Sequence, residues 1–153
     1  MLGVLIYADG SCINNGLPTA VGGWGAILIG TGSLNNLIKE ASGRILPTPN
    51  QRVTNQRAEI IAVISALRLL KRPCKIILHT DSQYVVGIMR DGWKKKENLD
   101  LWNELLDVSK EHSIEWVHIR GHKGNSYNER CDYLAQRSAR EATPDKLIPN
   151  NLY

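Results

Sequence analysis

The order of apolar and polar residues divides the chain into strand-length and helix-length segments. Residues 2–9 form an almost continuous apolar run, which is typical of a strand buried on both faces, whereas residues 114–119 alternate between apolar and polar positions. Turn-forming residues at 30–33 separate two further apolar runs. We therefore predict strands over residues 2–9, 22–29, 37–44, 75–79 and 114–119.

Apolar residues recur at helical spacing in most of the remaining chain. Thr54 or Asn55 can cap the longest of these segments, and Lys71-Arg72-Pro73 supplies positive charge and a proline stop after it. Asn98 can cap another helix, and residues 121–126 are expected to form a flexible loop. We predict helices over residues 55–70, 82–89, 99–110 and 129–142. Three early strands followed by alternating helices and strands indicate an α/β fold, a five-stranded mixed sheet with helices packed on both faces.

The length and composition fit one globular domain. The chain has 153 residues, of which 42% are hydrophobic and 22% charged, without low-complexity tracts or internal repeats. We expect a domain over residues 1–142 and a C-terminal tail over residues 143–153. The apolar runs are too short, or too broken by charge, to cross a membrane, and the N-terminus lacks the features of a signal peptide. We therefore expect an intracellular, cytoplasmic protein, and nothing in the sequence demands more than a monomer.

Four acidic residues stand where the pattern predicts apolar surroundings. Asp9 and Asp81 each end an apolar strand segment, and open α/β sheets bind ligands at the C-terminal ends of their strands. Glu59 shares a helical face with small and apolar residues, and Asp132 does the same in the last helix. Carboxylates gathered away from water must bind protons unless a divalent cation neutralises them. Convergence of these four residues would therefore imply a metal site.

The carboxylates indicate which metal and which reaction to expect. They favour hard, oxygen-binding cations, Mg²⁺ or Mn²⁺, over zinc. Two such ions about 4 Å apart could activate a water molecule and stabilise the leaving oxygen in phosphodiester hydrolysis. For any single acid a simpler interpretation stays open, because an aspartate at the end of a strand often caps the next helix. Such a capping role is open for Asp9, which precedes Gly10, and for Asp81, which precedes Ser82.

Other chemistries have less support in the sequence. No nucleophile-elbow, phosphate-loop or dinucleotide-binding pattern is present. The three cysteines lack the spacing of a zinc or redox site, so we expect buried or half-buried free thiols. The net charge of +4 is compatible with a polyanionic partner. Lys94, Lys95 and Lys96 directly follow Trp93, which suits phosphate contact and stacking, although a lysine triplet near a helix start is equally often a solvated surface.

The motifs around the four acids resemble the ribonuclease H family, type 1, over residues 6–139. The segments that carry the resemblance follow the family's order: Tyr7-Ala8-Asp9-Gly10-Ser11, Gly22-Gly23-Trp24-Gly25, Thr54-Asn55-Gln56-Arg57-Ala58-Glu59, Thr80-Asp81-Ser82-Gln83-Tyr84, Gly121-His122 and Asn128-Glu129-Arg130-Cys131-Asp132. The resemblance implies that the four acids gather around two Mg²⁺ ions on a five-stranded mixed sheet. It also implies a metal-dependent endonuclease that hydrolyses the RNA strand of an RNA/DNA hybrid, leaving 5′-phosphate and 3′-hydroxyl ends.

The same resemblance implies roles for residues outside the acidic set. His122 resembles a mobile-loop histidine that assists proton transfer or product departure. The amides of Asn15, Asn55 and Gln56 resemble contacts to 2′-hydroxyl groups of the RNA strand. Simpler interpretations stay open for Asn15 as a turn residue and for Asn55 and Asn98 as helix caps. The residues that resemble the DNA-strand phosphate pocket and channel are Arg52, Thr54, Asn98 and Trp93, with the basic patch Lys94, Lys95 and Lys96 beside them.

Two alternative functions remain at this point. Recombination nucleases and integrases share a related carboxylate-bearing sheet, so the same fold could act on DNA, but their motifs match less closely. The other alternative is a nucleic-acid-binding module that has lost catalysis. Retention of all four acids and of His122 argues against it.

The segment after Asp81 is shorter than in many bacterial members of the family. Those relatives carry a longer basic segment with an extra helix, whereas only residues 82–97 separate Asp81 from Asn98 here. We therefore predict weaker and more salt-sensitive binding of an RNA/DNA hybrid than in relatives with the full segment. Binding titrations of the two proteins over matched salt concentrations check this prediction. Equal affinity and equal salt dependence would contradict it.

Overall fold

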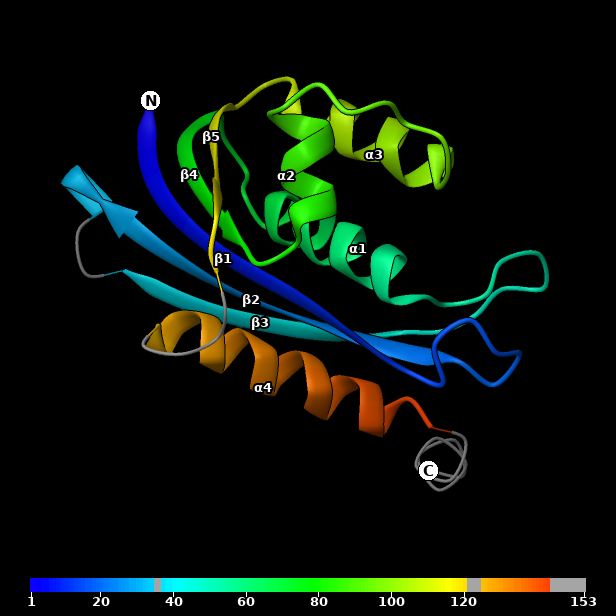
Figure 1. The fold of residues 1–153 in the computed structure, drawn as a ribbon. Helices are drawn as coiled ribbons and strands as arrows, with labels where there is room; N and C mark the ends of the chain where they lie inside the picture. Colours follow the sequence, from blue (N-terminus) through cyan, green and yellow to red (C-terminus); the bar gives the residue numbers. More distant parts are fainter. Residues whose placement is uncertain (35–36, 121–124, 144–153) are drawn as a thin grey trace.

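The computed structural model describes residues 1–34, 37–120 and 125–143, which form one sheet with helices on it. The sheet has five strands in the order β3-β2-β1-β4-β5 (Figure 1). The strands are β1 (Leu2–Ile13), β2 (Val21–Thr31), β3 (Ile38–Ile45), β4 (Cys74–Thr80) and β5 (Ser113–His118). The helices are α1 (Asn55–Arg68), α2 (Gln83–Met89), α3 (Leu99–Ser109) and α4 (Ser126–Glu141), with a 3₁₀ turn, η1, at Gly32–Leu34. The predicted five-stranded mixed sheet is confirmed.

The sheet combines an antiparallel half with a parallel half. β1 pairs with β2 from Gly3, opposite Thr31, to Ile13, and β2 pairs with β3. On its other side β1 runs parallel to β4, but this pairing stops at Tyr7 and His79. The last part of β1 therefore has a neighbouring strand on one side only, and the sheet opens beside the end of β4.

Helices cover both faces of this sheet, as predicted and as Figure 1 shows. α4 crosses one face against β1, β2 and β3, and α1 lies on the opposite face with α2 and α3 beside it. Two glycines of β2 allow α4 to pack closely. A Cβ at Gly23 would lie 2.2 Å from the Ala135 carbonyl oxygen, and one at Gly25 would lie 2.5 Å from that of Cys131.

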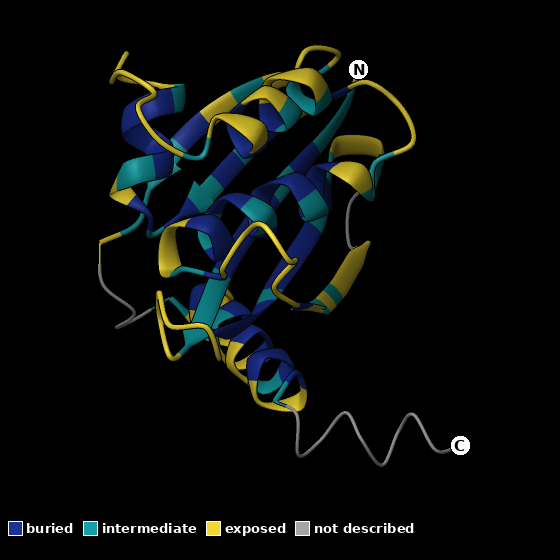
Figure 2. Cartoon of the chain, turned by 90° about the vertical axis from the view of Figure 1, so that its right-hand side faces the viewer, coloured by how far each residue is buried: buried dark blue, intermediate teal, exposed yellow. Residues whose placement is uncertain are grey.

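The main core lies between the sheet and α1. Ile60 and Leu67 of α1 pack in one cluster with Ile6 of β1 and Leu78 of β4, and α3 adds the fully buried Trp102. Figure 2 shows that burial concentrates on the strands and the inner helical faces, whereas loops and outer helical turns are exposed. The apolar faces that predict the helices are therefore the faces that pack against the sheet.

Most element ends lie within two residues of the predictions, and two differ by more. β1 continues past Asp9 to Ile13, because β2 supplies hydrogen-bond partners where β4 no longer does. Asp9 therefore lies within a strand, and the prediction that it ends one is wrong. α4 begins at Ser126 instead of residue 129, because Asn125 Oδ1 accepts a hydrogen bond from the Asn128 N–H and caps the first turn.

The predicted helix caps have different outcomes. Thr54 caps α1, because its Oγ1 accepts from the Arg57 N–H at 3.1 Å, and Asn55 is the first residue of the helix. Asn98 stands at the N-cap position of α3 with a left-handed backbone (φ 57°), but its side chain makes no capping hydrogen bond. Asn98 thus stands at the cap position without the usual side-chain hydrogen bond, and its side-chain amide is hydrogen-bonded to other residues instead.

Predictions about the whole chain are tested in part. Within the described residues, no helix is both long and apolar enough to cross a membrane. Residues 144–153 of the predicted tail lie outside the described residues, so the domain boundary after residue 142 stays a prediction. All three cysteines are free thiols, with Cys74 and Cys131 buried and Cys12 half-buried, as expected.

We predict that Gly23→Ala destabilises the protein by about 3 kcal/mol, because the added methyl group must displace backbone atoms of α4. Its Cβ would lie 2.2 Å from the Ala135 oxygen and 2.4 Å from the Ala139 nitrogen. Denaturant unfolding measures the loss. Gly16→Ala is the control: nothing lies within 4 Å of its Cβ, so only its positive φ of 77° costs stability, about 1 kcal/mol. Equal losses for the two variants would contradict the close packing of α4.

Candidate active site

β1 carries Asp9 into the place where the sheet opens. Asp9 is only 5% exposed and lies opposite Gly25 of β2. Its carboxyl group is hydrogen-bonded to that of Asp132 on α4. The adjacent Cys131 donates its thiol hydrogen to the Tyr7 carbonyl oxygen, at 3.3 Å. Asp9 therefore faces α4, which is tied to β1 at this point.

α1 brings Glu59 close to β1 from the opposite face of the sheet. This approach requires Gly10, since a Cβ there would lie 2.3 Å from the carbonyl carbon and oxygen of Ala58. The Ser82 hydroxyl donates a hydrogen bond to the Glu59 carboxylate. Ser82 also caps α2, because its Oγ accepts from the Val85 N–H at 3.1 Å. Glu59 is therefore held between β1 and the start of α2.

Asp81 directly follows β4, where the end of β5 holds its backbone. His118 Nε2 donates to the Asp81 carbonyl oxygen at 3.2 Å, and the Ile119 N–H donates to the Thr80 carbonyl oxygen at 2.9 Å. Because a carbonyl oxygen only accepts, His118 carries its hydrogen on Nε2. The pairing of β1 with β4 has ended here, so Asp81 lies beside the stretch of β1 that carries Asp9.

Asp132 completes the acidic set from α4. It is half-buried, and its Oδ2 accepts a hydrogen bond from Gln136, one helical turn further on, at 2.9 Å. The four predicted acids thus come from a strand, the residue after a second strand, and one helix on each face of the sheet. The structure brings these distant segments of the chain together, as the sequence predicts.

The electrostatics of the site show how strongly the acids affect one another. Burial first, and then the negative charges of the other three acids, raise the pKa of Asp9 from 3.8 to about 9. Burial also raises the pKa of Glu59, with a contribution from the charge of Asp81 and against the opposing effect of the Ser82 hydrogen bond. Without a cation, Asp9 therefore keeps its proton at neutral pH.

The donor set fits a hard divalent cation. Asp9 Oδ2 is buried and has no hydrogen-bond partner among the described residues. A buried carboxylate oxygen without a donor is costly, and a cation would satisfy it. Within the described residues, no three His, Cys, Asp or Glu side chains are already gathered closely enough to hold a metal ion. The acids are therefore close enough to repel one another but not yet at ligand distance, and their role as metal ligands stays a prediction.

A polar groove of about 1110 Å³ lies one turn of α1 away from Glu59. The Asn15 Oδ1 atom accepts a hydrogen bond from the Asn55 N–H at 2.8 Å, which ties the loop after β1 to the first turn of α1. The interpretation of Asn15 as a turn residue is confirmed, whereas that of Asn55 as a helix cap is wrong, because Thr54 caps α1. The predicted substrate-binding residues in the groove lining are Asn15, Thr54, Asn55, Gln56, Lys96 and Asn98.

The other predicted binding residues lie outside this groove lining. Arg52 lines a smaller cavity of about 210 Å³, and its Nη1 donates to the Gly16 carbonyl oxygen at 3.2 Å. Trp93 is half-exposed, with its ring against Gly87 of α2, where a Cβ would lie 2.2 Å from the indole. Lys95 is exposed, and His122 lies outside the described residues. Lys94 joins Lys96, Gln56 and Tyr84 around a cavity of about 200 Å³.

Two residues without a predicted role contact Asn98 from behind the groove lining. Arg57 is only 8% exposed, and its guanidinium group binds Asn98 and Asp100. Tyr84 accepts a hydrogen bond from the Asn98 amide. The sequence holds a signal for Arg57, since a charged residue stands in the buried row of α1 that continues with Ile60 and Ile64.

The chain matches one protein family along nearly all of its length. The family model described as RNase H matches residues 2–140. A ribonuclease H of Moorella thermoacetica is 44% identical over 97% of this chain and 98% of its own length, and one of Pelobacter propionicus is 46% identical over 90% of this chain and 85% of its own.

Two solved structures are similar as well. LC9-RNase H1, a type 1 RNase H with the type 2 active-site motif, has a TM-score of 0.75 and 30% identity over 94% of this chain and 74% of that chain. LC11-RNase H1 in complex with RNA/DNA hybrid has a TM-score of 0.71 and 26% identity over 91% of this chain and 98% of that chain.

We predict that Asp9→Asn stabilises the metal-free protein by about 1–3 kcal/mol at pH 8 and by less at pH 5. The folded state keeps the Asp9 proton up to about pH 9, whereas the unfolded state loses it near 3.8. Rising pH between these values therefore favours unfolding of the parent protein, and the amide removes this effect. Denaturant unfolding with a chelator at both pH values measures it.

The control for this prediction is Asp107→Asn on α3. Asp107 is an exposed carboxylate, and its hydrogen bond from Lys110 lowers its pKa. This variant should show no gain in stability that grows with pH. If Asp9→Asn is only as stable as the parent at pH 8, the claim that burial and neighbouring acids disfavour the ionised form of Asp9 is wrong.

Proposed function

The chain belongs to the ribonuclease H family and hydrolyses the RNA strand of RNA/DNA hybrids, and we propose that the four acids of the candidate site hold its divalent cations. Hydrolysis in this family depends on a divalent metal. The observation that carries the proposal is Asp9, a buried acid with an unpartnered oxygen and a pKa raised to about 9 by its acidic neighbours. Such a group is stable as a carboxylate only beside positive charge.

We propose two Mg²⁺ ions per site, with Mn²⁺ as an alternative, held by Asp9, Glu59, Asp81 and Asp132. When bound, they would supply an activated water molecule and stabilise the leaving oxygen. The chain itself supplies the placement of the ligands. Ser82 favours the ionised form of Glu59 by donating a hydrogen bond to it. The products would carry 5′-phosphate and 3′-hydroxyl ends.

We assign recognition of the hybrid to the groove beside Glu59. The Oδ1 atom of Asn15 is already used by the Asn55 N–H, so Asn15 would offer its Nδ2 hydrogens to the RNA strand. Asn55 and Gln56 would present their amides to 2′-hydroxyl groups in the same groove. Because Gln56 precedes Glu59 by about one helical turn, an RNA strand bound there would lead its backbone toward the acids.

The DNA strand is assigned to the far side of the groove. Thr54 and Asn98 would bind a phosphate there, with Lys96 in the same lining. Trp93 and Lys94 lie on the adjoining loop and would extend the contact along the strand. His122 keeps its proposed role in proton transfer from the sequence alone.

We predict that Asp81→Asn lowers kcat about a thousandfold or more, because loss of a ligand removes several kcal/mol of metal-derived transition-state stabilisation. Hybrid binding should change little, since phosphate and 2′-hydroxyl contacts stay in place. Single-turnover cleavage and a binding titration on the same labelled hybrid measure both quantities. Asp107→Asn, the exposed control, should cut at the parent rate.

The substrate is tested with a panel of labelled RNA/DNA hybrid, duplex DNA and duplex RNA, each with and without Mg²⁺. We expect cutting of the hybrid alone, in its RNA strand and only with the ion. Cutting of duplex DNA would favour a related-fold nuclease or integrase. An Asp81→Asn variant that cuts at the parent rate would refute the metal site.

A further inference from the structure

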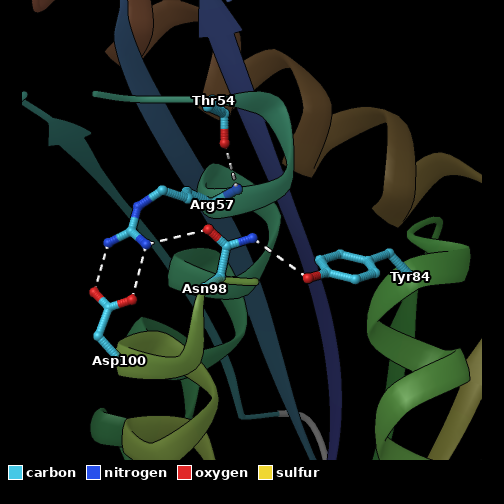
Figure 3. Close-up of polar contacts among 5 residues, drawn as sticks. All are labelled: Thr54, Arg57, Tyr84, Asn98 and Asp100. Atoms are coloured by element: carbon cyan, nitrogen blue, oxygen red, sulfur yellow. Dashed lines mark hydrogen bonds and ion pairs between the residues drawn. The ribbon is translucent and has the colours of Figure 1, made fainter. Parts of the chain in front are cut away.

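A buried arginine connects the two residues assigned to the DNA-strand phosphate. The backbone N–H of Arg57 donates to Thr54 Oγ1 at 3.1 Å, and its Nη1 donates to Asn98 Oδ1 at 3.2 Å (Figure 3). The guanidinium group also forms a two-point ion pair with Asp100, Nη1 to Oδ1 at 2.9 Å and Nη2 to Oδ2 at 2.7 Å. Thr54 is the N-cap of α1 and Asn98 stands at the N-cap of α3, so Arg57 links the starts of two helices at the groove.

These contacts determine which atoms of Asn98 face the groove. Its Oδ1 is used by Arg57, and one hydrogen of its Nδ2 is donated to Tyr84 Oη at 3.3 Å. Tyr84 is in turn fixed by the fully buried Trp102, whose Nε1 donates to the same Oη at 3.2 Å. An asparagine amide has two N–H hydrogens, so the second one remains for a ligand. The network therefore sets Asn98 as a donor.

The other half of the pocket is set in the same way. Thr54 Oγ1 accepts from the Arg57 N–H, which leaves its hydroxyl hydrogen to be donated. Thr54 and Asn98 line the same groove. Two donors in one groove suit phosphate oxygens, which only accept.

Asn98 needs such support because its backbone is not in a common conformation. It stands at the N-cap of α3 with φ 57° and ψ 36°, without the side-chain bond that usually holds an N-cap asparagine. Left-handed conformations of residues other than glycine persist where surrounding contacts hold them, and they concentrate at functional sites. The contact from Arg57 and the one to Tyr84 are the side-chain bonds that hold it here.

The ion pair between Arg57 and Asp100 is too exposed to contribute much to stability by itself. The Asp100 side chain is 60% exposed, and ion pairs open to water add little stability. A second ion pair, Arg68 with Glu104, already links α1 to α3 and is outside the groove lining. Orienting the Arg57 guanidinium group toward Asn98 is therefore the better use of Asp100.

We propose that Arg57 and Asp100 are positioning residues, which hold Asn98 so that its amide N–H is presented to a phosphate of the DNA strand. This inference rests on the proposed function, which places that phosphate between Thr54 and Asn98. Asp100 also lines the groove, but its carboxylate has no hydrogen to donate to a phosphate oxygen. Its effect on the reaction passes through Arg57 to Asn98.

The test is a double-mutant cycle on hybrid cleavage with Mg²⁺, read as kcat and KM separately. Asn98→Ala should raise KM about tenfold, the loss expected for one hydrogen bond to a charged group, and change kcat less than twofold. Asp100→Ala should raise KM by a similar factor. The double variant should be no worse than Asn98→Ala alone, because Asp100 acts through Asn98.

The matched control is Glu104→Gln, which removes the other ion pair between the same two helices. It should leave KM and kcat at the parent values. All rates are measured well below the lowest unfolding temperature in the series. If Asp100→Ala does not fold, Arg57→Lys replaces it in the same cycle, since an ammonium group cannot hold Asn98 and Asp100 in the two-point geometry.

The outcomes separate this inference from the function on which it rests. If Asn98→Ala leaves KM unchanged, the assignment of Asn98 to a phosphate pocket is wrong, and the positioning role falls with it. If Asn98→Ala raises KM but the effect of Asp100→Ala is independent and simply multiplies it, only the positioning role is overturned. A rise in KM with Glu104→Gln would overturn it too, because any loosening of α3 would then suffice.

Discussion

The repulsion between the buried Asp9 and three half-buried acids is the interaction around which this molecule is arranged. β1 continues to Ile13, whereas its pairing with β4 ends at Tyr7, and this offset leaves a stretch of strand with helices above and below but no strand on one side. Asp9 stands in that stretch, Asp81 stands just past β4, and the two helical layers each add one acid. A sheet whose strands ended together would leave no such open side of β1 beside Asp81.

The rest of the fold must supply the stability that the acids remove. A pKa of about 9 for Asp9 means that its ionised form is strongly disfavoured in the metal-free protein. Close contact of β1 with α1 at Gly10, and of β2 with α4 at Gly23 and Gly25, holds the elements together in spite of this repulsion. The same contacts bring the acids within range of one another, so the packing that stabilises the fold also creates the need for a cation.

Much of this arrangement is visible in the sequence, because it depends on residue patterns. The apolar runs predict all five strands and four helices, and acids in apolar surroundings predict which side chains meet. The exact end of β1 is not visible, since its continuation past Asp9 depends on pairing with β2, which is distant in sequence. The early start of α4 is not visible in the sequence either, because its cap, Asn125, lies in a segment whose composition predicts a loop.

The groove shows the limit of prediction more sharply. Thr54 and Asn98 can be named from their motifs, but the link between them through Arg57 joins atoms far apart in the chain and depends on side-chain orientation. Arg52 shows the converse case, because its motif suggests a phosphate contact while its guanidinium group binds the Gly16 carbonyl. Patterns therefore identify candidate residues, and only the packing decides which of them share one cavity.

The most direct test of the account is the number of protons released when Mg²⁺ binds. Calorimetric titration at pH 7 in buffers of different ionisation enthalpy gives that number without any substrate. The account predicts release of about one proton, lost from Asp9 as the cation takes its place, and no such release from Asp9→Asn. Binding of Mg²⁺ to the parent protein without proton release would contradict the claim that mutually repelling acids around the buried Asp9 form the metal site.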